Sequence, residues 1–189
     1  MKIGLFGISL LSVNYGVTAL GLAQLDFLER IAVKNNIKLE YYIFSGDDFN
    51  KISEIKKKLN INSKITIQKL INLKSGLKGF SNIANKIKEC DIIIDLTYGD
   101  SFSDIYGFKN FLLYSIPKLM TIHNDRTLVI GPQTIGPYKN KLVKIISNKI
   151  LNKATILCVR DEKSLALAQN MTEREDIICL LYTSPSPRD

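Results

Sequence analysis

Short apolar segments alternate with longer amphipathic segments along nearly all of this 189-residue chain. The short segments are rich in Ile, Leu, Val and aromatic residues, which is typical of strands. Ile92, Ile93 and Ile94 would be apolar on both faces of such a strand, as expected when helices cover both sides of a sheet. The expected strands are residues 2–8, 38–44, 65–68, 91–96, 128–130 and 155–159.

Between these strands, apolar residues recur with the periodicity of amphipathic helices. Strands that alternate with helices favour right-handed crossovers and a parallel sheet. We therefore predict an α/β fold, a doubly wound parallel sheet of the Rossmann-like type. Pro117 is expected to kink or split the fourth helix. The expected helices are residues 17–33, 47–59, 76–89, 108–122, 138–152 and 161–170.

Several classes of protein are excluded by simple features of the sequence. No apolar run reaches the length of about 18 residues that a membrane-spanning helix needs. The first residues lead directly into a strand, without the pattern of a signal peptide. Cys90, Cys158 and Cys179 are odd in number and widely spaced, so they indicate neither a disulfide framework nor a zinc site. We expect a cytoplasmic protein without a metal or cofactor.

The net charge of +8 is concentrated in residues 51–88, which contain ten Lys, no Arg and a single Glu. The first interpretation is a solvated basic face. The second is contact with an anionic membrane surface. Nucleic acid is not expected as a partner, because aromatic residues do not alternate with the lysines to form a stacking surface. A non-enzymatic module that binds nucleic acid or an anionic surface would also leave the polar loops described below unexplained.

The composition changes abruptly in the last eleven residues, 179–189, where two Ser-Pro pairs occur. This segment is similar to the translation of a transposase-adapter sequence used in sequencing libraries. Artificial segments are excluded from fold reasoning. We therefore assign residues 1–178 to one truncated Rossmann-like N-terminal domain, expect the C-terminal domain to be missing, and interpret residues 179–189 as an artefactual tail. A natural tail is the alternative.

Polar residues follow the ends of the first and fourth strands, where parallel sheets bind ligands. Asn14 and Gly16 could bind substrate through free backbone N–H groups at the start of a helix, or they could simply cap it. Residues 95–104 contain three Asp and two Ser directly after an apolar strand. Carboxylates there can orient sugar hydroxyls or act as a general base. Asp100 and Asp104 are the catalytic candidates, and Ser101 is a substrate-binding candidate.

Two further loops contain candidates for substrate binding. Residues 131–137, with the sequence GPQTIGP, predict a rigid loop in which Gln133, Thr134 and Gly136 face a ligand. Arg160 follows the last expected strand, and its planar guanidinium suits a carboxylate or phosphate. An ion pair with Asp161, the expected N-cap of the next helix, is the alternative for Arg160. The only histidine, His123, ends a helix, where a favourable contact with the helix dipole is more plausible than catalysis.

Taken together, these segments resemble the polysaccharide pyruvyl transferase family. The resemblance implies two Rossmann-like domains that face each other across a cleft, as in GT-B glycosyltransferases, of which this chain would be the N-terminal one. The family often has consecutive glycines where this chain has Thr97, Tyr98 and Gly99. The matching segments are NYG (14–16) with ALG (19–21), GDSFSDIYG (99–107), GPQTIGP (131–137) and RDEKS (160–164).

The resemblance also implies a reaction and its partners. A pyruvyl group would pass from phosphoenolpyruvate to hydroxyls of a sugar or lipid-linked oligosaccharide, forming a ketal for a cell-surface polysaccharide. Arg160 would bind the donor anion, N–H groups near residues 134–136 would bind phosphate or sugar, and Asp100 or Asp104 would orient or deprotonate the acceptor. A GT-B-like glycosyltransferase domain that uses a nucleotide sugar is the alternative. The fragment alone is expected to be inactive, because both domains would form the cleft.

Overall fold

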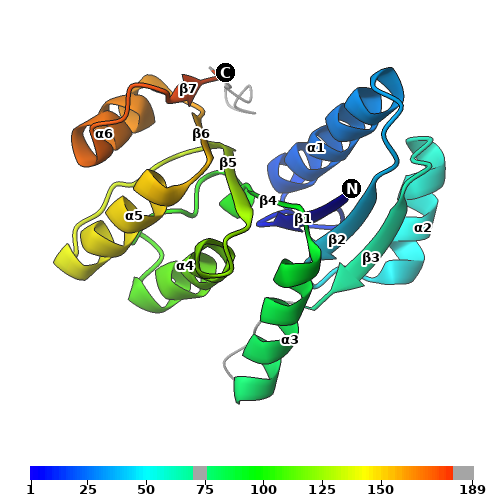
Figure 1. The fold of residues 1–189 in the computed structure, drawn as a ribbon, viewed down its shortest axis with the longest axis horizontal. Coiled ribbons are helices and arrows are strands. Elements are labelled where there is room, and N and C mark those ends of the chain that lie inside the picture. The colour runs from blue at the N-terminus through cyan, green and yellow to red at the C-terminus, as the bar shows by residue number, and fades with distance from the viewer. Residues whose placement is uncertain (70–75, 181–189) are drawn as a thin grey trace.

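One parallel sheet forms the centre of the computed structural model, which describes residues 1–69 and 76–180 (Figure 1). Its strands are β1 (Lys2–Phe6), β2 (Glu40–Phe44), β3 (Lys64–Gln68), β4 (Ile92–Asp95), β5 (Thr127–Gln133), β6 (Ile156–Val159) and β7 (Ile178–Cys179). Their order across the sheet is β3-β2-β1-β4-β5-β6-β7. The direction of winding therefore reverses between β1 and β4, and such reversals create a crevice at the carboxyl ends of the two strands.

Helices connect the successive strands and cover both faces of the sheet. They are α1 (Tyr15–Lys34), α2 (Phe49–Lys58), α3 (Gly76–Glu89), α4 (Phe108–His123), α5 (Lys141–Lys153) and α6 (Glu162–Thr172), with a short 3-10 turn, η2 (Thr97–Gly99), after β4. Each predicted strand and helix is confirmed, with small shifts at the ends. The α4 helix runs through Pro117 as a single element, so the proline does not split it.

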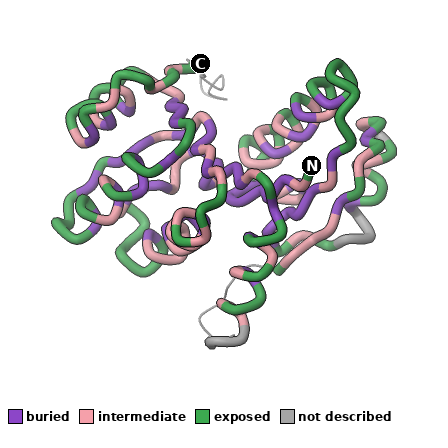
Figure 2. The backbone as a smooth tube through the Cα atoms, in the orientation of Figure 1, coloured by how far each residue is buried: buried purple, intermediate pink, exposed green. Residues whose placement is uncertain are grey.

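The buried apolar side chains form two clusters, one on each face of the sheet. Figure 2 shows that much of the central part of the fold, where the strands lie, is buried. Leu5 points to the face covered by α1 and α2, and its neighbour Phe6 points to the face covered by α3 to α6. Successive side chains of a strand point to opposite faces, so both must be apolar when both faces are covered. This explains why the strands read as continuous apolar runs.

The last strand lies outside the predicted set. Cys158 of β6 pairs with Ile178, Val159 pairs with Cys179, and the N–H of Leu180 donates to the carbonyl of Val159 at 2.9 Å. Cys179, which the composition assigned to the tail, thus belongs to the sheet, and Leu180, assigned to the tail as well, is hydrogen-bonded to it. Residues 181–189 lie outside the described part of the chain.

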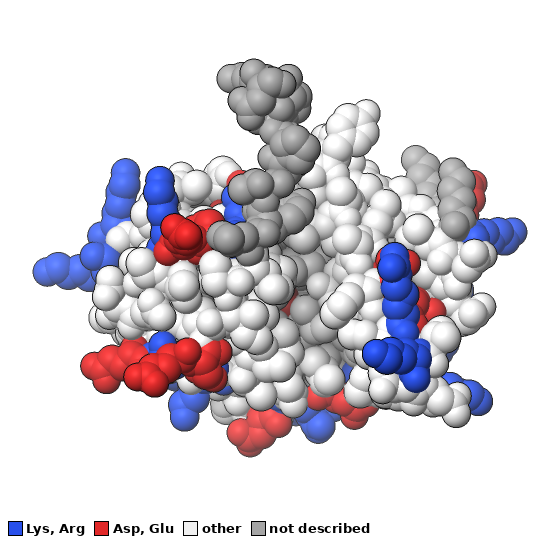
Figure 3. Space-filling view, turned by 90° about the horizontal axis from the view of Figure 1, so that it is seen from above, with Lys and Arg blue, Asp and Glu red and all other residues white. Residues whose placement is uncertain are grey.

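The lysines of residues 51–88 are partly paired with nearby acids. Lys64 lies 2.9 Å from Glu40, and Lys86 lies 2.8 Å from Glu89. In the face seen in Figure 3, basic side chains lie around the periphery, with acidic ones among them. The side chains of Lys51, Lys58, Lys74 and Lys78 lie outside the described residues. Within residues 1–69 and 76–180, no helix combines the length and apolar character needed to cross a membrane.

Gly7 brings the end of β1 against the turn that follows β4. Its φ of +64° lies in the left-handed region, and a Cβ atom there would lie 2.2 Å from the backbone nitrogen of Thr97. The carbonyl of Gly7 accepts a hydrogen bond of 2.6 Å from the N–H of Tyr98. Only glycine combines this conformation with so close a backbone approach.

The Gly7→Ala variant should lower the free energy of unfolding by about 2 kcal/mol or more, because the new methyl group strains the backbone and overlaps Thr97. Urea unfolding followed by circular dichroism measures the change. Gly46→Ala is the matched control, since nothing lies within 4 Å of its added Cβ atom. Equal unfolding midpoints for the two variants would contradict this account of the β1 turn.

Candidate functional site

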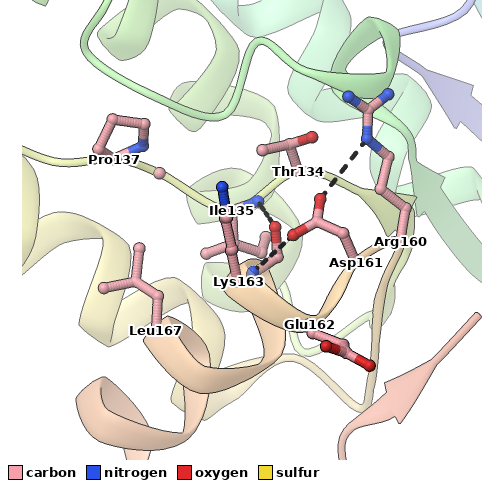
Figure 4. A pocket seen from close by; sticks show the side chains of 10 residues that line it. Thr134, Ile135, Pro137, Arg160, Asp161, Glu162, Lys163 and Leu167 are labelled. Atoms are coloured by element: carbon pink, nitrogen blue, oxygen red, sulfur yellow. Dashed lines mark hydrogen bonds and ion pairs between the residues drawn. The ribbon is translucent and has the colours of Figure 1, made fainter. Parts of the chain in front are cut away.

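The turns at the carboxyl edge of the sheet enclose two neighbouring pockets. The first, called the Asp100 pocket, has a volume of about 130 Å³. The second, called the Thr134 pocket, is larger, at about 720 Å³ (Figure 4). The Asp100 pocket is lined by Asn14, Gly16, Val17, Leu20, Tyr98, Gly99, Asp100, Pro132 and Arg160. The Thr134 pocket is lined by Thr134, Ile135, Gly136, Pro137, Arg160, Asp161, Glu162, Lys163, Ser164 and Leu167.

Arg160 lines both pockets and therefore stands between them. Its Nε atom lies 3.8 Å from Asp161 Oδ2, a loose ion pair on a side chain that is one-third exposed. A terminal nitrogen of its guanidinium would lie 3.7 Å from a Cβ atom placed on Gly99, so the guanidinium reaches the turn after β4. Figure 4 shows Arg160 at one end of the Thr134 pocket, with Pro137 and Leu167 at the other.

The carboxylate of Asp100 is available at the rim of its pocket. Its two oxygens accept hydrogen bonds from the hydroxyls of Ser101, at 3.1 Å, and of Tyr106, at 3.2 Å. The negative charge of Asp100 raises the pKa of Tyr106, so that phenol remains a hydrogen-bond donor. A carboxylate has about four acceptor positions, which leaves Asp100 able to accept a hydrogen bond from a ligand hydroxyl as well.

Asp104, the other catalytic candidate, instead holds the start of α5. Its Oδ2 atom accepts hydrogen bonds from the backbone N–H groups of Lys139, at 2.9 Å, and Asn140, at 2.8 Å. It lines neither pocket. The structure therefore gives Asp104 a role in the fold, and its role in a reaction stays a prediction.

Asp95, the third carboxylate of this segment, is buried in an ion pair with Lys118 of α4 at 2.9 Å. Sequence reasoning did not select Lys118. The only available signal was a lone lysine directly after Pro117, in a helix whose other side chains around it are mainly apolar. Burial lowers the pKa of the Lys118 ammonium, and the adjacent Asp95 carboxylate opposes that shift.

The resemblance implied that backbone N–H groups of the 134–136 loop bind phosphate or sugar. In the structure these groups are not free to do so. Each donates within the protein, which locks the loop against the neighbouring turns. The acceptors are the carbonyl of Gly99 for Thr134 (2.8 Å), the hydroxyl of Ser164 for Ile135 (2.9 Å) and the carbonyl of Phe102 for Gly136 (3.0 Å). What this loop offers a ligand is therefore its side chains and its shape.

Gln133 and Thr134 occupy different environments. Gln133 is fully buried and donates from Nε2 to the carbonyl of Asp95 at 3.2 Å, so it supports the site from below. Thr134 lines its pocket, and its buried hydroxyl has no hydrogen-bond partner among the described residues. A buried hydroxyl without a partner is costly, which makes Thr134 Oγ1 a candidate contact for a bound molecule.

At the start of α1, the capping interpretation is confirmed. Asn14 Oδ1 accepts from the N–H of Gly16 at 3.0 Å and from the N–H of Val17 at 3.3 Å. These donors are thus satisfied by the protein, although Asn14 and Gly16 both line the Asp100 pocket. Asp161 is likewise the N-cap of α6 and accepts from the N–H of Ser164 at 2.7 Å, as predicted.

Three residues that shape the site were missed. Tyr98 lines the Asp100 pocket, and burial raises its pKa to about 12, so its phenol stays protonated. Lys163 adds a second basic side chain to the Thr134 pocket. Asp47, after β2, fixes the loop before α1 by accepting from the hydroxyl of Ser9 at 2.7 Å and the N–H of Leu10 at 2.8 Å.

A parallel doubly wound sheet with helices on both faces and polar turns at its carboxyl edge defines a Rossmann-like domain. The chain belongs to the polysaccharide pyruvyl transferase family, which it matches over residues 14–181. No curated protein matches the chain.

Among the solved structures that share the fold are two crystal structures of HepE from Anabaena, one in complex with UDP-glucose and one with UDP and glucose. Each superposes with a TM-score of 0.51 at 13% and 12% sequence identity, respectively, over 98% of this chain and 47% of that chain. This chain thus spans about half the length of HepE.

Replacing the two candidate carboxylates should affect stability differently. Asp104→Ala removes the acceptor of two backbone hydrogen bonds and should lower the free energy of unfolding by about 2 kcal/mol. Asp100→Ala breaks contacts at the rim of a pocket and should change it by less than about 0.5 kcal/mol. Thermal and urea unfolding of the two variants compares them. A loss of stability from Asp100→Ala as large as that from Asp104→Ala would show that both carboxylates serve the fold.

Proposed function

We propose that this chain forms the part of a polysaccharide pyruvyl transferase that brings the donor anion beside an acceptor sugar. The position of Arg160 carries the proposal, because one guanidinium lines both the Asp100 pocket and the Thr134 pocket. A cation between an acidic pocket and a larger mixed pocket suits a reaction between an anionic donor and a hydroxyl-bearing acceptor. Membership of the family supports the same assignment.

The reaction requires phosphoenolpyruvate and two hydroxyls of one sugar. A proton adds to the methylene carbon, and the resulting oxocarbenium-like carbon is attacked by the first hydroxyl. Inorganic phosphate then leaves, and the second hydroxyl attacks the same carbon to close the ketal. Of the two hydroxyl protons, one balances the proton gained by the new methyl group and the other departs with phosphate.

The residues of the two pockets would divide these tasks. Arg160 and Lys163 would bind the carboxylate or phosphate of the donor in the Thr134 pocket, where the hydroxyl of Thr134 supplies a further hydrogen bond. Asp100 would accept the proton of an acceptor hydroxyl or orient it. Tyr98 would contact the sugar as a neutral phenol. Gln133 is buried beside the site and would hold the turns after β4 and β6 in place through its hydrogen bonds with Asp95 and Arg160.

We further propose that a second lobe completes the site. Val13, in the loop after β1, and Tyr15, the first residue of α1, are 98% and 88% exposed, and Ile105 in the loop after β4 is 54% exposed. Apolar side chains gathered on neighbouring loops are typical of a surface that another lobe covers. The share of the HepE chain that this chain spans, 47%, supports the same division into halves.

The acceptor would be a sugar or lipid-linked oligosaccharide, handled at the cytoplasmic side of the membrane. Several lysines of residues 51–88 could contact the anionic surface from which such an acceptor is presented. Lys64 and Lys86 are already paired with acids, which limits how much of this charge is free.

The Arg160→Gln variant tests the donor site. Titration of the 189-residue chain with phosphoenolpyruvate, followed by amide NMR spectra, should shift resonances of Thr134, Arg160 and Lys163. The variant should weaken binding about tenfold or more, because it removes a charge-assisted contact of about 1.5–3 kcal/mol. Arg30→Gln is the matched control, since Arg30 is exposed on α1 and pairs with Asp26 within that helix.

Two outcomes would contradict the proposal. Unchanged phosphoenolpyruvate affinity in Arg160→Gln would remove Arg160 from the donor site. Shifts caused by UDP-glucose but not by phosphoenolpyruvate would favour a glycosyltransferase domain that uses a nucleotide sugar.

The 189-residue chain should release no phosphate from phosphoenolpyruvate in the presence of an acceptor sugar, because one wall of the cleft would be absent. A coupled phosphate assay measures this, with inorganic phosphate added as a positive control. Ketal formation by this chain alone would show that no second lobe is required.

A further inference from the structure

A fully buried lysine contacts the turn that leads to Asp100. Lys118 is 0% exposed, and its ammonium donates to the hydroxyl of Thr97 at 2.7 Å and to the carbonyl of Tyr114 at 2.9 Å. The carboxylate of Asp95 lies 2.9 Å from it. All three donors of the ammonium thus have acceptors, as a buried charge requires.

The same residues hold an unusual backbone turn. Thr97, Tyr98 and Gly99 have φ values of 37°, 56° and 90°, so three successive residues lie in the left-handed region. This conformation is strained for Tyr and more so for the β-branched Thr. Thr97 is nevertheless held there, because Asp95 Oδ1 accepts from its backbone N–H at 2.9 Å and also from its hydroxyl.

The turn of residues 97–99 positions the neighbouring residues of the site. The carbonyl of Gly99 accepts from the N–H of Thr134, which joins the two pockets, and the guanidinium of Arg160 lies beside Gly99. Asp100 follows directly and carries the carboxylate of its pocket. A change in the turn would therefore move Asp100 and the surface against which Arg160 rests.

We propose that Lys118 is a positioning residue, whose ion pair with Asp95 holds the left-handed turn of residues 97–99 and thereby sets the geometry between Asp100 and Arg160. It acts through Thr97 and touches no substrate. Only the effect of Lys118 on donor binding rests on the proposed function. Its effect on the conformation of the turn can be measured without a ligand.

A purely structural ion pair would act on the whole domain, whereas a positioning residue acts on the turn. Lys118→Met leaves the Asp95 carboxylate buried without its partner, so this variant could fail to fold. Asp95→Asn combined with Lys118→Met removes both charges at nearly constant volume. Such double replacements of a buried pair are often tolerated, which makes this variant suitable for the test.

Amide hydrogen exchange and NMR of the 189-residue chain give the readout. In the double variant, the amides of Ser101 and Thr134 should exchange about tenfold faster, because the turn that holds their acceptors opens more often. The amide of Leu5, in the sheet, should keep its protection. The side-chain N–H resonance of Arg160 should shift, and the dissociation constant for phosphoenolpyruvate should rise about fivefold.

Two controls separate the turn from general stability. Ile150→Val weakens the core at α5, far along the chain from the turn, and should leave the relative exchange of Ser101 and Leu5 unchanged. Thr97→Ser keeps the hydroxyl that accepts from Lys118, and Thr97→Ala removes it while both charges remain. Only Thr97→Ala should reproduce the fast exchange, so this pair decides the question even if the double variant does not fold.

The outcomes distinguish this proposal from the proposed function. Wild-type exchange at Ser101 and Thr134 in Thr97→Ala, or in a folded double variant, would overturn the role of Lys118. Fast exchange with an unmoved Arg160 resonance would also overturn it, because the turn would then not set the site. Failure of the wild-type chain to bind phosphoenolpyruvate would instead contradict the proposed function, while the exchange rates and the Arg160 resonance still test Lys118.

Discussion

The buried ion pair between Lys118 and Asp95 is the interaction on which the carboxyl edge of this domain depends. It lies at the end of β4, beside the point where the winding of the sheet reverses. Two charges removed from water are tolerated there because each hydrogen of the ammonium has an acceptor. A well-packed apolar pair could stabilise the core as well, but it could not hold the hydroxyl and N–H of Thr97. The main effect of the ion pair is therefore to fix the conformation of the turn at Thr97, and its contribution to the stability of the domain is secondary.

Backbone hydrogen bonds between turns account for the rigidity of the site. The N–H of Thr134 donates to the carbonyl of Gly99, and the N–H of Arg160 donates to the carbonyl of Gln133. The turns after β4, β5 and β6 are therefore joined to one another by backbone hydrogen bonds. Because these donors are consumed, the site that we propose presents side chains to a ligand, chiefly Asp100 and the guanidinium of Arg160.

The fold could be predicted from the sequence because apolar periodicity reports burial directly, and Ile92, Ile93 and Ile94 needed two covered faces. The gathering of Asp100, Thr134 and Arg160 could also be predicted, since parallel strands end at one edge. The roles of individual side chains could not. Asp100 and Asp104 look alike in the sequence, and only the path of the chain brings Asp104 to the start of α5. Lys118 was missed because its partner is 23 residues away and on another element.

Thr97 and Tyr98 stand where the family often has consecutive glycines, and the structure of this turn explains how the chain accommodates them. Glycine adopts a positive φ without a steric cost but offers no side chain to hold the conformation. Thr97 and Tyr98 incur that steric cost, but each has a side chain whose contacts hold the turn. The Thr97 hydroxyl joins Asp95 to Lys118, and the ring of Tyr98 packs edge-on against Tyr114 at 5.6 Å between centroids. The chain therefore reaches a left-handed turn through side-chain contacts where glycines would reach it through freedom of the backbone. A turn held in this way depends on α4, because Tyr114 and Lys118 both belong to that helix.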